Sequence, residues 1–92
     1  MSVDTVNYAL TDVTRRIRDN PNNFSEQGLS KLLAICACMR DCLMGGYIAD
    51  FDRYVDGLLA REPDAADYVL EDLFNELNIQ DRDQLSAILA AE

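Results

Sequence analysis

The residues of this chain best suited to chemistry are three cysteines crowded into one short stretch, Cys36, Cys38 and Cys42. Cys38 and Cys42 are four residues apart, so a helix places them on one face, whereas Cys36 points elsewhere. Two thiols without an imidazole fall short of a tetrahedral zinc site unless a second subunit supplies two more ligands, and the chain has no histidine. We therefore expect the three cysteines to pack in a core as small hydrophobic residues. An interchain zinc site or a redox switch is the alternative.

Two other stretches resemble ligand sites and fail on detail. The stretch Asp52–Gly57 begins like a calcium loop, but Tyr54 stands at loop position 3, and Pro63 replaces the glutamate expected at position 12. The second stretch is basic. It holds Arg15, Arg16 and Arg18, which are offset by nearby acids and suit the negative end of a helix dipole. Neither calcium binding nor direct binding to nucleic acid is expected.

Catalysis has few candidate residues. Without histidine, the commonest general base and metal ligand is missing. Gly45-Gly46 lacks the rest of a phosphate-binding loop. The chain has the size and acidity of an acyl carrier, but Ser30 and Ser86 both lack the Asp-Ser-Leu setting that such a carrier needs. We predict that the protein is not an enzyme and has no cofactor and no metal.

These residues must be positioned by helices, because apolar residues recur every three or four positions in five segments. The sequence predicts an all-α fold, a small antiparallel bundle of four helices plus a short C-terminal fifth helix, forming a single helical domain over residues 1–92. The segments are bounded by helix signals: Pro21 after the first, Ser25 and Gly45-Gly46 around the second, Pro63 between the third and fourth, Asn78 after the fourth, and an Asp81–Gln84 capping box before the fifth.

The second predicted helix is apolar nearly all round. Such a helix is surrounded by protein, either as the central helix of the domain or at a subunit interface. The interface alternative makes the protein a structural or scaffolding homodimer. Its interface residues would be Leu33, Ile35, Met39, Cys42 and Met44.

The net charge of −9 is confined to the C-terminal half of the chain. Residues 1–24 and residues 25–46 each carry equal numbers of acids and bases, whereas residues 47–92 carry all nine excess negative charges. Asp67 and Glu71 are like-charged neighbours four residues apart, and so are Asp72 and Glu76. Each such pair costs an isolated helix about 0.2–0.5 kcal/mol. Retaining this repulsion suggests that a basic surface elsewhere makes use of it, although a merely solvated acidic face or an acidic proteome is the competing explanation.

These features favour a non-enzymatic protein–protein interaction module. The leading hypothesis is a small acidic inhibitor or regulator that docks on the basic site of a nuclease or other nucleic-acid-binding protein by mimicking nucleic acid. Phage anti-CRISPR proteins, anti-restriction proteins and nuclease immunity proteins form this functional class. The predicted partner-binding residues are Asp50, Asp52, Asp56, Asp64, Asp67, Glu71, Asp72 and Glu76.

The sequence also bears on location. No basic region followed by an apolar stretch opens the chain, and no uncharged run approaches the ~20 residues of a membrane span. The odd, clustered cysteines do not suit a secreted disulfide framework. We expect a cytoplasmic protein without membrane contact, in the host-cell cytoplasm if a phage encodes it.

Overall fold

The computed structural model describes residues 3–91, which form five α-helices and two short 3-10 turns without a β-strand. The prediction of an all-α bundle with a short fifth helix is confirmed. The elements in chain order are α1 (Val3–Asp19), η1 (Pro21–Asn23), α2 (Glu26–Met44), η2 (Ile48–Asp50), α3 (Phe51–Arg61), α4 (Pro63–Leu77) and α5 (Arg82–Ala90).

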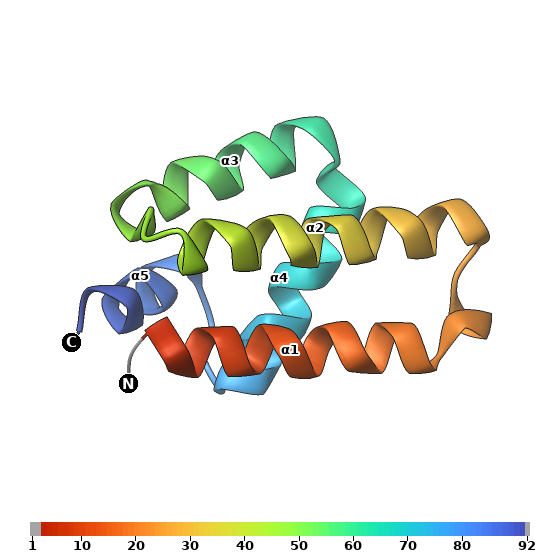
Figure 1. The fold of residues 1–92 in the computed structure, drawn as a ribbon, viewed down its shortest axis with the longest axis horizontal. Helices are drawn as coiled ribbons and strands as arrows, with labels where there is room; N and C mark the ends of the chain where they lie inside the picture. The colour runs from red at the N-terminus through yellow and green to blue at the C-terminus, as the bar shows by residue number, and fades with distance from the viewer. Residues whose placement is uncertain (1–2, 92) are drawn as a thin grey trace.

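Helices α1 and α2 lie side by side and antiparallel, and α3 returns along the other side of α2 (Figure 1). Helix α4 crosses behind this layer and packs against α1, α2 and α3. The short α5 contacts α1 at the end of the molecule where the chain begins. The arrangement therefore has two sides, a front made by α1 and α2 and a back crossed by α4.

One hydrophobic core joins all five helices. Its largest fully buried side chains include Leu10 of α1, Met39 of α2, Val55 of α3 and Leu73 of α4, and α5 contributes Leu85. Among the described residues no polar or charged residue is buried. The core is thus held by apolar packing, and the charged side chains are left for the surface.

The ends of the helices follow local signals in the sequence. The Ser25 side chain accepts a hydrogen bond from the Gly28 N–H at 3.0 Å and so caps α2. Asn78 ends α4 in the left-handed conformation, with φ of 55°. The Asp81 side chain accepts from the Gln84 N–H at 2.9 Å, as the predicted capping box requires.

Two local details differ from the sequence-based expectation. The Gln84 side chain accepts a hydrogen bond from the N–H of Gln80, one residue before the cap, instead of from Asp81. Ile48, expected on the apolar stripe of the third helix, lies in the 3-10 turn η2, and α3 begins at Phe51. Both differences lie at the start of a helix, and the spacing of apolar residues does not fix the exact residue at which a helix begins.

Helix α2 is apolar nearly all round because it is the central helix, in contact with α1, α3 and α4. Ile35, Met39 and Cys42, three of the five residues expected at a dimer interface, are buried against the chain's own helices. A second subunit cannot reach these three side chains in this conformation, and the homodimer remains a prediction. Leu33 is half-buried and Met44 is 70% exposed.

The core predicts the effect of shortening a side chain in α4. Leu73 has no exposed surface, so Leu73→Ala leaves a cavity and should cost about 2–5 kcal/mol of unfolding free energy. The same substitution at the half-buried Leu33 serves as the matched control and should cost clearly less. Urea unfolding followed by far-UV circular dichroism measures both, and equal losses would contradict the packing described here.

Candidate functional site

The eight predicted partner-binding acids all lie at or near the surface, with seven exposed and Asp72 half-buried. The structure does not gather them into one uniform face. It divides them into two pairs that are each held by an arginine, a stripe of three on α4, and a separate Asp50.

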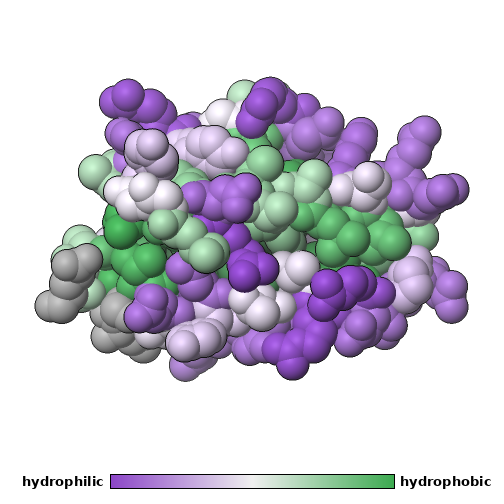
Figure 2. Space-filling model, viewed as in Figure 1, coloured by the Kyte–Doolittle hydropathy of each residue, from purple (hydrophilic) through white to green (hydrophobic). Residues whose placement is uncertain are grey.

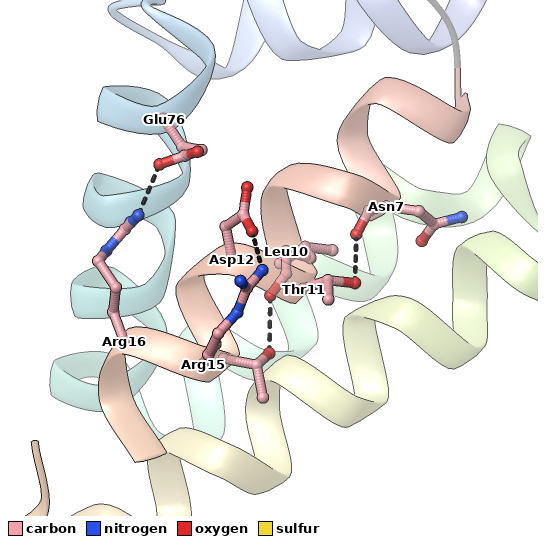
Figure 3. Close-up of polar contacts among 8 residues, drawn as sticks. Asn7, Leu10, Thr11, Asp12, Arg15, Arg16 and Glu76 are labelled. Atoms are coloured by element: carbon pink, nitrogen blue, oxygen red, sulfur yellow. Dashed lines mark hydrogen bonds and ion pairs between the residues drawn. The ribbon is translucent and has the colours of Figure 1, made fainter. Parts of the chain in front are cut away.

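The first pair is Asp72 and Glu76 on α4, held by Arg16 of α1. The Arg16 guanidinium lies 2.6 Å from Glu76 through Nη1 and 3.3 Å from Asp72 through Nη2, and the contact with Glu76 is drawn in Figure 3. The hydrogen bond that Arg16 donates to Glu76 raises the pKa of Arg16 above its usual value despite partial burial. The charges of these two acids, four residues apart, are therefore partly offset by Arg16.

The second pair is Asp52 and Asp56 on α3, held by Arg82 at the start of α5. Nη1 of Arg82 lies 2.6 Å from Asp56, and Nη2 donates to both the side chain and the backbone carbonyl of Asp52. Burial lowers the pKa of Arg82, but its hydrogen bonds to Asp56 and Asp52 outweigh this and raise it overall. Arg82 thereby joins α5 to α3.

Sequence reasoning missed both arginine contacts. It assigned Arg16 to the helix dipole and treated the repulsion between Asp72 and Glu76 as kept for a partner. A signal was present, because each acidic pair at i,i+4 spacing presents a site where one guanidinium can bridge two carboxylates. The chain has few bases to fill such sites, and the other paired ones are Arg15 with Asp12 and Lys31 with Glu62 (Figure 3 shows the first).

The third group is the acidic stripe, defined here as Asp64, Asp67 and Glu71 on α4. Their spacing of three and four residues places them along one side of the helix. The apolar residues of α4, such as Leu73, lie on its opposite, buried side. All three are exposed, and among residues 3–91 none of them forms an ion pair. The acidic stripe is the part of the predicted docking face whose charge is left uncompensated.

Asp50 lies apart from these groups, in a cleft of about 380 Å³ that it lines together with Cys38, Cys42 and Tyr54. The Cys42 thiol donates a hydrogen bond to the Tyr47 carbonyl at 3.5 Å. Burial, and then the Asp50 carboxylate, raise the pKa of the Cys42 thiol.

Cys36 is fully buried, and burial raises the pKa of its thiol as well. A raised pKa keeps both Cys36 and Cys42 in the protonated form at neutral pH, which is neither a strong nucleophile nor a metal ligand. In the part of the chain that the structure describes, no group of three or more histidine, cysteine or acidic side chains is arranged to hold a metal ion.

Within residues 3–91, no helix is long and apolar enough to cross a membrane.

The burial of the thiols predicts how they react. Cys38 is half-buried, whereas Cys36 and Cys42 are buried, so a thiol reagent such as Ellman's reagent should label Cys38 first in the native protein. The other two should react only as fast as the structure opens locally. A Cys38→Ser variant is the matched control and should lose the fast phase. Rapid labelling of all three thiols in the folded wild type would contradict this assignment.

Comparison of the chain with models of protein families, with curated protein sequences and with solved structures finds no match.

Proposed function

We propose that this protein is a non-enzymatic binding module that docks its acidic stripe on the basic site of a nucleic-acid-binding protein and so inhibits or regulates it. The observation that carries the proposal is the uncompensated charge of Asp64, Asp67 and Glu71, which are exposed and unpaired among residues 3–91. In this proposal the other five predicted partner-binding acids are secondary contacts.

The stripe is rigidly mounted, which suits recognition. Helix α4 packs against three other helices, and its buried side includes Ala66, Val69 and Leu73, none of which has exposed surface. The backbone of a packed helix loses little conformational freedom when its charged side chains bind a partner. This lowers the entropic cost of association.

The stripe is a row of negative charges, as one strand of nucleic acid is, with a wider spacing between the charges. With a rise of about 1.5 Å per residue, Asp64 and Glu71 are about 10 Å apart along the helix axis, so the three charges are spaced about 5 Å apart. One DNA strand carries a phosphate about every 3.4 Å along the duplex axis. The stripe therefore offers a groove of lysines and arginines a row of charges at about two-thirds of the linear density of one strand.

The arginine-held pairs extend this display. Arg16 with Asp72 and Glu76, and Arg82 with Asp52 and Asp56, each leave one net negative charge. Beside the stripe, Tyr68 is 44% exposed and offers an aromatic ring of the kind that basic interfaces use, because arginine stacks on such rings.

A direct test compares capture of partners by the wild type and by a charge-reversed variant. We expect the wild type to retain a nucleic-acid-binding protein from its native host extract at ~0.05 M salt and to release it at ~0.5 M salt, because screening shortens the reach of the charges. Replacing Asp64, Asp67 and Glu71 with lysine should lower the association rate with the purified partner at least about tenfold, measured by surface plasmon resonance.

The matched control reverses three exposed acids elsewhere, Asp19, Glu26 and Asp83, and changes the net charge by the same amount. It should retain most of the binding, and circular dichroism should show unchanged helix content in both variants. DNA or RNA added to the complex should displace the protein. A partner that binds nucleic acid and this protein at once, or equal losses in the two variants, would refute the mimicry.

A further inference from the structure

A groove beside the acidic stripe combines an aromatic ring with an unpaired carboxylate. It lies between the first turns of α2 and the first turns of α4 and has a volume of about 450 Å³, a size typical of ligand sites in proteins. Its walls include the apolar residues Leu32, Pro63 and Ala65, and Tyr68 and Asp64 line it as well. The groove therefore offers apolar surface, an aromatic ring and a negative charge in one place.

The charge of the groove is incomplete, and this distinguishes it from other apolar surface. Figure 2 shows apolar surface also on the side made by α1 and α2, where hydrophilic residues interrupt it. In the lining of the groove, Lys31 and Glu62 form an ion pair at 3.4 Å. Asp64 is exposed and has no ion pair among residues 3–91. One negative charge is left over, and a single cation balances it.

The Tyr68 ring is accessible to such a cation. Tyr68 is 44% exposed and packs against Phe24 in an edge-to-face arrangement, with ring centroids 5.5 Å apart and an angle of 88° between the ring planes. In this arrangement Phe24 covers at most one face of the Tyr68 ring. The face of an aromatic ring is negative and attracts a cation placed over it. Tyr68 therefore retains surface on which a cation can stack.

The chain itself uses the same groups on the other side of Tyr68. Asp64 and Asp72 lie four residues before and after this tyrosine, so both are its neighbours on α4. A second hollow, of about 180 Å³, has Tyr68, Asp72 and Arg16 in its lining, and the Arg16 guanidinium lies 3.3 Å from Asp72. The described residues that line the Asp64 groove include no arginine. Asp64 therefore shares the aromatic neighbour of Asp72 and lacks its guanidinium.

We propose that the groove binds an arginine side chain of the partner protein. The guanidinium stacks on Tyr68 and donates hydrogen bonds to the Asp64 carboxylate, while its methylene groups pack against Pro63 and Ala65. Arginine suits the groove better than lysine, because a planar guanidinium stacks on a ring and pairs with a carboxylate at the same time. The inference rests on the proposed function, which supplies a basic partner, and it names the residue type that is recognised.

A peptide with one arginine tests the groove on the full chain without the partner. The probe is an arginine flanked by two glycines on each side and blocked at both ends. The matched controls carry citrulline, which keeps the shape and loses the charge, or lysine. In two-dimensional amide NMR spectra, we expect the arginine peptide to shift the signals of Ala65 and Tyr68 and to bind about threefold more tightly than the lysine peptide. The citrulline peptide should leave these signals in place.

Two substitutions separate the ring from the charge. Tyr68→Leu should weaken binding of the arginine peptide at least about threefold and remove its advantage over the lysine peptide. Asp64→Asn, at an exposed position where folding is unaffected, should also weaken it at least about threefold. Tyr8→Leu, at a tyrosine that is 74% exposed and outside the groove, is the matched control and should bind as the wild type does. Circular dichroism checks the helix content of all three variants.

Several outcomes would overturn the arginine groove. They are equal binding of the arginine and citrulline peptides, shifts that avoid the groove, and an arginine peptide indifferent to both Tyr68→Leu and Asp64→Asn. Groove signals that move with protein concentration alone would assign the groove to a second copy. The proposed function fails separately, in the capture experiment with the charge-reversed stripe. If that variant loses the partner while Tyr68→Leu captures it as the wild type does, docking through the stripe stands and the arginine groove is wrong.

Discussion

The burial of one side of α4 is the interaction on which the rest of the structure depends. Leu73 and its neighbours on this helix close the core against α1, α2 and α3. Because a helix turns its residues through a fixed angle, burying this side also decides what faces water. Asp64, Asp67 and Glu71 are exposed as a direct result. The core and the charge display are therefore two consequences of the same packing.

The two arginine contacts relieve a repulsion that two of the helices carry on their own. Asp72 and Glu76 repel each other within α4, and Asp52 and Asp56 do so within α3. Arg16 and Arg82 answer this repulsion from other helices. The Arg16 side chain is 46% exposed, so its ion pairs add little to stability, on the order of 0–1 kcal/mol.

Much of the fold was predictable because its signals are local. Ser25, Asn78 and Asp81 act on residues within a few positions of themselves, and the apolar spacing marks each helix without reference to the others. The acidic stripe was also predictable, since its three members share one helix. What remained hidden depends on contacts across the chain. Glu76 is 60 residues from Arg16, and Arg82 is 30 from Asp52. The pattern of α2 also suits a central helix and a subunit interface equally, and only the packing shows that Met39 faces inward.

The separation of a neutral N-terminal half, with α1 and α2, from an acidic C-terminal half, with α3, α4 and α5, has a consequence for how the molecule meets another. The centre of its negative charge does not coincide with its centre of mass, since residues 1–46 are neutral and residues 47–92 carry the excess. In the field of a positively charged surface such a particle is turned as well as attracted. It would arrive with its C-terminal half leading.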